Sequence, residues 1–111
     1  MDCLTTITVR FTAEGFHHWP DAPEHRSYLR HPHRHLFHVE VTTPVTHHER
    51  QIEFHDLMET AKCLFRVREA SASCESMAFQ LATALSERLG KRPFTVSVFE
   101  DAECGETVQL Q

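Results

Sequence analysis

The sequence lacks the features that mark nucleic-acid-binding and membrane-spanning proteins. It carries 11 Lys and Arg against 16 Asp and Glu, for a formal net charge of −5, whereas a nucleic-acid surface normally needs a basic excess. No apolar run approaches the about 18 residues that span a bilayer, and the first residues alternate instead of forming a signal-peptide core. We therefore expect no nucleic-acid partner, no membrane association and a cytoplasmic protein.

The sequence also lacks paired cysteines. Its four cysteines, Cys3, Cys63, Cys74 and Cys104, form no CxxC motif, and a reducing compartment makes a disulfide framework unexpected. We expect free thiols. A chain of 111 residues can bury one core but not two, so residues 1–111 are predicted to form a single domain.

Histidine is the residue that the sequence holds in excess. There are ten, seven of them between His17 and His38, and no contiguous tag-like run accounts for them. His33 and His35 begin a predicted strand over 33–43. Residues two apart on a strand project from the same face with Cα atoms about 6.6 Å apart, so this pair can share a metal ion.

The third ligand is expected from FHHW at 16–19, which supplies His17 or His18. Three neutral imidazoles with an open fourth position make a catalytic-type zinc site. Histidine also suits nickel, copper and iron, so zinc is a preference. The plain alternative is a histidine-rich surface strand, which the second cluster upstream disfavours.

Hydrophobic periodicity predicts an α+β fold. Strands are expected over 4–11, 33–43, 94–99 and 107–111, with a turn at Gly105 and a further short strand at 51–54 as an alternative. A helix is expected from Asp56 to about Arg68, with Asp56 and Glu59 as a capping box. A second helix begins after Ser73 as N-cap, carries apolar residues at four-residue spacing, and stops at Gly90.

The element order predicts an antiparallel four-stranded sheet with both helices on one face. Residues 13–32 contain three prolines and no helical period, so a long excursion between the first two strands is expected, of the kind that is usually functional. Such a sheet leaves two edges unpaired. Closing it with copies of itself into a barrel would remove them, so we expect a homo-oligomer.

Segments along nearly the whole chain resemble the 6-pyruvoyl- and 6-carboxytetrahydropterin synthases. The resemblance implies the T-fold, in which units of two strand pairs and two helices assemble into barrels, here as a trimer or hexamer. The segments are FTA at 11–13, a histidine after it, HRHLFHVEV at 33–41, IEFHDL at 52–57, SCESMA at 73–78 and VSVFE at 96–100.

The resemblance implies a zinc ion held at the position of the family's HGH motif. His33 and His35 match the two histidines of that motif, and His17 is the nearest match to the ligand that follows the first strand. Two extra residues separate His17 from the FTA segment, which leaves His18 as the alternative ligand.

The resemblance further implies a pocket for a pterin-like or guanine-like ligand. Glu100 resembles the glutamate that anchors the pterin's amino and ring N–H groups, as a bidentate carboxylate can. Ser73, Cys74 and Glu75 resemble the segment that lines the same pocket, where helix-start N–H groups hold ring oxygens. Glu53, with Phe54 after it, replaces the family's Asp-Phe pair. Structural roles are the alternative to ligand binding. Glu100 could simply be an exposed strand end, and Glu75 could interact with the dipole of the helix that it starts.

The chain departs from the family where protons are moved. It has neither the cysteine shortly before the HGH motif nor the Asp-His pair between the helices, so the usual general base is missing. We favour a zinc-dependent lyase or hydrolase on a pterin, deazaguanine or guanine-like substrate, with Glu24, His31, His18 or Cys74 as the base. A non-catalytic zinc-containing binding protein, or a metal-buffering or interaction module, is the alternative.

Overall fold

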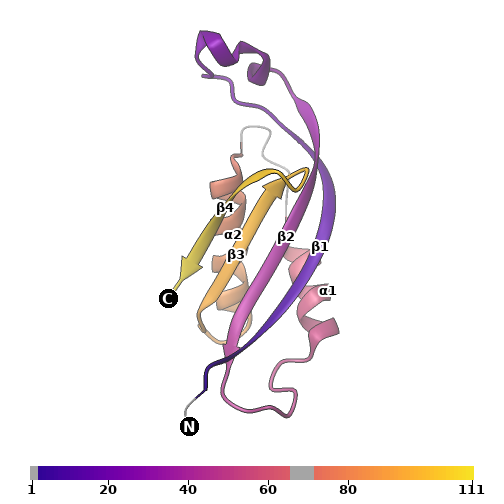
Figure 1. The fold of residues 1–111 in the computed structure, drawn as a ribbon, viewed down its shortest axis with the longest axis vertical. Coiled ribbons are helices and arrows are strands. Elements are labelled where there is room, and N and C mark those ends of the chain that lie inside the picture. Colours follow the sequence, from indigo (N-terminus) through magenta and orange to yellow (C-terminus); the bar gives the residue numbers. More distant parts are fainter. Residues whose placement is uncertain (1–2, 66–71) are drawn as a thin grey trace.

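A four-stranded antiparallel sheet in the order β1-β2-β3-β4 is the framework of the computed structural model, which describes residues 3–65 and 72–111 (Figure 1). The predicted α+β class and the order of strands and main helices are confirmed. The elements are β1 (Thr5–His17), the 3-10 helix η1 (Glu24–Arg30), β2 (His33–Val45), α1 (Phe54–Leu64), α2 (Cys74–Arg88), β3 (Phe94–Glu100) and β4 (Cys104–Leu110).

The core lies between one face of the sheet and the two α-helices, which cover that face together (Figure 1). Alternate residues of each strand point into it, so odd positions of β1 and β2 and even positions of β3 carry its buried side chains. None of the helices in residues 3–65 and 72–111 is long and apolar enough to cross a membrane. The largest fully buried side chains are Phe37, Phe94, Leu57, Met77, Leu81 and Leu85.

The first strand is longer than predicted, and it includes one of the residues predicted to bind a metal. β1 continues through residues 13–17, which were expected to start the excursion, because they pair with 33–37 of β2. Gly15 lowers the strand propensity of this stretch, so long-range pairing decides its conformation. His17 is therefore a strand residue and not a loop residue. Of the expected excursion, only 18–32 lies outside the strands, and it contains η1, which was not predicted.

The first helix begins earlier than the predicted capping box. Glu53 is the N-cap, with its carboxylate accepting the N–H of His55, and Asp56 lies in the first turn. The alternative strand over 51–54 is therefore wrong, since Phe54 already starts α1. The helix ends at Leu64, and the predicted end at Arg68 lies outside the described residues, as does most of the REASAS linker at 68–73.

The second helix matches its prediction at both ends. Ser73 is the N-cap of α2 and its hydroxyl accepts the N–H of Ser76 at 3.1 Å. Gly90 follows the helix with φ of +91°, the left-handed conformation that ends helices and that glycine adopts without strain.

The turn between β3 and β4 differs from its prediction. Asp101 and Ala102 both have positive φ, and the N–H of Glu103 donates to the carbonyl of Glu100 at 2.9 Å. Gly105, expected in the turn, instead pairs with Phe99 inside β4. The strand starts at residue 104 and not at 107. This turn places Glu100 and Asp101 beside the end of β2 that carries the histidines.

Candidate metal centre

The site is the continuation of the apolar core beyond its last hydrophobic side chain. His33 and His35 lie on the same face of β2 as buried Phe37, and His17 of β1 pairs directly with His33. On the other side of β2, Glu100 ends the inward-facing row of β3 and pairs with Phe37. Three neighbouring strands therefore each present a polar side chain at one end of the core.

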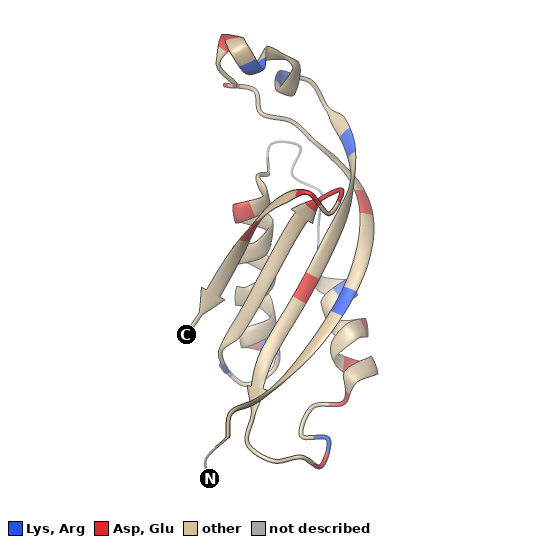
Figure 2. Cartoon of the chain, in the orientation of Figure 1, with Lys and Arg blue, Asp and Glu red and all other residues tan. Residues whose placement is uncertain are grey.

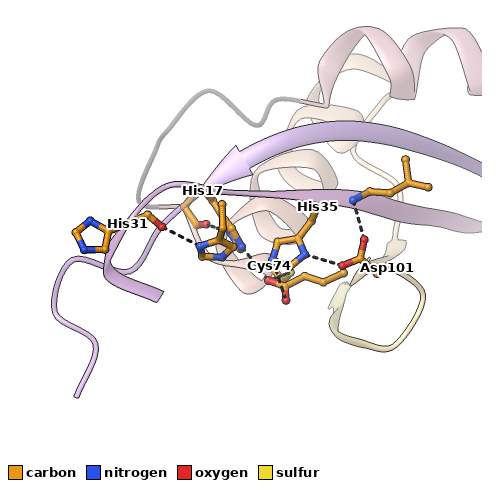
Figure 3. Close-up of polar contacts among 9 residues, drawn as sticks. His17, His31, His35, Cys74 and Asp101 are labelled. Carbon is orange, nitrogen blue, oxygen red and sulfur yellow. Dashed lines mark hydrogen bonds and ion pairs between the residues drawn. The ribbon is translucent and has the colours of Figure 1, made fainter. Parts of the chain in front are cut away.

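The three histidines predicted as ligands lie together. One ring nitrogen of each lies within 4.8 Å of the others, and the ring centroids are 4.6 Å apart for His17 and His33, 4.8 Å for His33 and His35, and 5.1 Å for His17 and His35. His17 is 8% exposed, and Figure 3 shows its ring turned toward that of His35. His18 lies next to this group but outside it.

Each of the three rings has its Nδ1 occupied by an oxygen acceptor. Nδ1 of His17 bonds to the carbonyl of Ala72 at 3.0 Å, that of His33 to the carbonyl of His31 at 2.9 Å, and that of His35 to the carboxylate of Asp101 at 2.7 Å. Carbonyl and carboxylate oxygens only accept, so Nδ1 carries the ring proton. Each Nε2 is then left with a lone pair, the arrangement typical of metal-binding histidines.

Nε2 of His17 and Nε2 of His35 are both buried, and neither makes a hydrogen bond within the part of the chain that the structure describes. The carboxylate of Glu100 lies 3.0 Å from the first and 3.6 Å from the second. Lone pairs that face a carboxylate repel it unless a cation lies between them. The residues therefore fit a divalent metal ion with imidazole ligands.

Burial lowers the pKa of His17 below its usual value, while the Ala72 hydrogen bond and the charge of Glu100 offset part of this effect. The contact between His17 and Glu100 would be an ion pair only if His17 were protonated, and burial opposes protonation. A neutral imidazole is the form that binds a metal. Electrostatics therefore favours the metal-binding state of this ring.

Asp101 is a site residue that the sequence analysis missed. One of its oxygens accepts from His35 and the other accepts the backbone N–H of Leu36 at 2.9 Å, as Figure 3 shows. These hydrogen bonds, the His35 bond first, lower the pKa of Asp101. Only its position after Glu100 could have pointed to it, because the pairing of β2 with β3 decides which histidine it reaches.

A cavity of about 510 Å³ opens beside the histidines. Predicted ligand-binding residues Ser73, Cys74, Glu75 and Glu100 all line it, so the start of α2 and the end of β3 meet there. The remaining lining residues are His17, His18, Trp19, Leu29, His33, Ala72, Cys104, Gly105 and Glu106.

Cys74 is buried in the cavity wall, and its Sγ lies 3.8 Å from the carboxylate of Glu100. Burial first, and then the charge of Glu100, raise the pKa of the Cys74 thiol to about 12. The thiol is therefore protonated at neutral pH and donates to Glu100. In this state it is a poor base and a poor nucleophile.

Three other predicted residues do not reach the cavity. Glu24 lies on η1, exposed, 3.3 Å from Arg30. The ring of His31 points away from the histidine group (Figure 3), and only its carbonyl contacts His33. Glu53 caps α1 and is not among the lining residues of the cavity. Of the four candidate bases, His18 and Cys74 line the cavity.

The cavity has an acidic rim. Figure 2 shows acidic residues gathered at the β3–β4 turn and on the neighbouring parts of α2 and β4. Within residues 3–65 and 72–111, Glu75, Glu100 and Glu106 line the cavity and no Lys or Arg does. A carboxylate-lined hollow attracts cations, in agreement with a metal at its base.

Comparisons with protein families and with curated proteins do not assign this chain to a family. No family model and no curated protein matches this chain. Since a fold hosts many functions, the residues of the site are the basis on which a function can be proposed.

Proposed function

We propose that this chain is a zinc-dependent enzyme that acts on a pterin, deazaguanine or other guanine-like substrate. The observation that carries the proposal is the convergence of His17, His33 and His35, each with Nδ1 engaged and with one ring nitrogen of each within 4.8 Å of the others. Three imidazoles are the ligand set of catalytic zinc sites. A zinc ion there supplies Lewis-acid polarisation of a carbonyl or activation of water.

The substrate half of the proposal depends on the cavity beside the histidines. Glu100 offers a carboxylate that can accept two N–H groups from a guanidine-like edge. The helix start at Ser73 and Glu75 lines the same hollow, where free backbone N–H groups suit a ring carbonyl. A flat heterocycle with both a donor edge and a carbonyl fits this set of partners.

The proposal assigns proton transfer to His18. It lines the hollow, and its buried Nδ1 has no hydrogen-bond partner among residues 3–65 and 72–111. The ring can therefore take or give a proton without first breaking another contact. Glu24 and His31 point elsewhere, and the high pKa of Cys74 keeps its thiol protonated.

A non-catalytic zinc-containing binding protein for the same class of ligand is the second candidate. It is favoured by the protonated state of Cys74 and by the absence, among the described residues, of a carboxylate-paired histidine in the cavity besides the metal-site rings. Turnover separates the two candidates.

The T-fold and its assembly into a barrel belong to the same proposal. β1 and β4 are the edge strands, and their pairing with other copies would satisfy their free backbone groups. A trimer or hexamer is expected. Native mass spectrometry at low salt measures the subunit count, and a monomer at all concentrations would contradict this part.

Metal analysis of the purified chain tests the first half of the proposal. We expect about one zinc ion per chain, lost in a His33→Ala, His35→Ala double variant. The matched control is His25→Ala, His55→Ala, which removes two exposed histidines outside the cluster. Less than about half a zinc per chain that falls no further in the first variant would refute the metal site.

Thermal unfolding with added ligands tests the second half. Pterin, a 7-deazaguanine and guanosine nucleotides are added in turn, since a ligand that binds the folded state raises the midpoint by mass action. We expect a shift with at least one, lost in Glu100→Gln. Absorbance then follows turnover of the ligand that binds, with chelation as the control. Binding without chelator-sensitive turnover would favour the second candidate.

A further inference from the structure

Glu100 lies on the histidine side of the cavity. Its Oε1 is 3.0 Å from Nε2 of His17 and its Oε2 is 3.6 Å from Nε2 of His35. Both nitrogens carry lone pairs, because the ring protons lie on Nδ1. The carboxylate oxygens and the two ring nitrogens are therefore electron-pair donors that face one another.

These separations are close to those between two ligand atoms of one metal ion. With metal–ligand bonds of about 2.0–2.2 Å, two ligand atoms of tetrahedral zinc lie about 3.3–3.6 Å apart. Oε1 of Glu100 lies 3.0 Å from His17, slightly closer than this, and Oε2 lies 3.6 Å from His35, so one oxygen faces each ring. We infer that Glu100 is the fourth ligand of the metal, so that the resting site is His₃Glu. The inference depends on the proposed function, because it needs a metal at the three histidines.

The backbone on either side holds the carboxylate in place. Glu100 is the last residue of β3 and pairs with Phe37 of β2. The next residue, Asp101, bonds to both backbone groups of Leu36, with its N–H donating to the carbonyl at 2.8 Å and its carboxylate accepting the N–H at 2.9 Å. The thiol of Cys74 donates to Oε1. A ligand supported in this way is preorganised for its metal.

A fourth protein ligand changes how the site opens. With Glu100 on the metal, the position for substrate or water is closed. A ligand whose N–H edge takes both oxygens of Glu100 would draw the carboxylate away and open that position. Ligand recognition and access to the metal are then one event, which protects the metal from solvent ligands in the absence of substrate.

Cobalt substitution of the full chain tests this inference. Cobalt(II) reports coordination through its visible absorption, and azide is the probe for an open position. In the wild-type chain we expect a four-coordinate spectrum that azide changes little. In Glu100→Gln we expect azide to bind at least about tenfold more tightly and zinc to bind at least about tenfold more weakly, since even an outer-shell partner is worth that much. The matched control, Glu103→Gln, removes an exposed carboxylate of the turn after β3 that does not line the cavity and should leave both unchanged.

The outcomes separate this inference from the proposed function. Wild-type cobalt protein that binds azide as readily as Glu100→Gln would overturn the inference and leave the three-histidine site standing. A wild-type chain that binds neither cobalt nor zinc would overturn both. The azide titration of the wild-type chain decides the matter even if Glu100→Gln fails to fold, because tight azide binding there means that the fourth position is open.

Discussion

Asp101 holds the ring of His35 and the backbone of the same strand at once. Its Oδ2 lies 2.7 Å from Nδ1 of His35, while its Oδ1 accepts the N–H of Leu36. Asp101 has a positive φ of 52°, which aspartate and asparagine tolerate better than most residues. The tight turn after β3 therefore fixes the orientation of His35, a proposed metal ligand on β2.

Replacing Asp101 with asparagine is expected to weaken the metal site without unfolding the turn. Asparagine tolerates the left-handed conformation but carries no negative charge to hold the Nδ1–H of His35. Zinc affinity should fall by about 10- to 100-fold, measured by competition with a chromophoric chelator. Glu103→Gln, an exposed carboxylate of the same turn, is the control. Equal zinc affinity in Asp101→Asn and the control would show that the carboxylate has no role in positioning His35.

The stability of the metal-free chain should depend on pH through His17. Burial lowers the pKa of this ring in the folded state, so just below pH 6.5 the unfolded chain binds more protons than the folded one. The free energy of unfolding should therefore fall as the pH drops below 6.5, by at most about 1.4 kcal/mol per pH unit for one proton. Urea unfolding at several pH values, with chelator present, measures this slope.

His17→Asn is the comparison for that pH experiment. Asparagine keeps an N–H that can donate to the carbonyl of Ala72 but cannot titrate. The variant should lose part of the slope just below pH 6.5. Identical slopes in the two chains would mean that His17 is not the group responsible.

Elements whose periodicity and capping residues lie within one stretch of sequence were predictable. The run from Ser73 to Gly90 carries its N-cap, its buried spacing and its left-handed end within one stretch of sequence, and α2 matches it. The end of β1 was not predictable in this way. Its last five residues, 13–17, include a glycine and are strand because 33–37 lies beside them.

The histidines of the proposed site were predictable, but the residues that position them were not. The HxH spacing places His33 and His35 on one face from strand geometry alone. That His17, rather than His18, joins them depends on the register His17↔His33, and that register is fixed across 15 residues of intervening chain. The contact of Asp101 with His35 depends on the turn between β3 and β4. That turn was predicted at Gly105, four residues after Asp101, where it begins.

Cys74 should be the least reactive of the four cysteines. Its pKa of about 12 leaves almost no thiolate at pH 8, and the side chain is buried, whereas Cys3, Cys63 and Cys104 are exposed. Iodoacetamide at pH 8 is expected to add three groups to the native chain and a fourth only in denaturant, as followed by intact mass. Modification of Cys74 at the rate of the exposed thiols would mean that its pKa is not raised.

A side chain at Gly105 and one at Gly90 should both be unfavourable, for different reasons. A Cβ at Gly105 would clash with the carbonyl oxygen of Val98 and lie 2.6 Å from Cα of Phe99. A Cβ at Gly90 would meet no described residue within 4 Å, and its positive φ is what disfavours a side chain there. Overpacking of this kind costs about 1–3 kcal/mol, and alanine in the left-handed region costs about 1–2 kcal/mol. Both variants should therefore lower the free energy of unfolding.

Zinc affinity distinguishes the two glycine variants. Gly105 lines the cavity and pairs with the strand that ends in Glu100, so displacement of β4 by Gly105→Ala moves the turn that holds Glu100 and Asp101. Gly90 lies in the turn after α2, outside the cavity lining. We expect Gly105→Ala to bind zinc more weakly than the wild-type chain and Gly90→Ala to bind it equally well, measured with the same chelator. Unchanged affinity in Gly105→Ala would mean that the β3–β4 hairpin does not position the metal site.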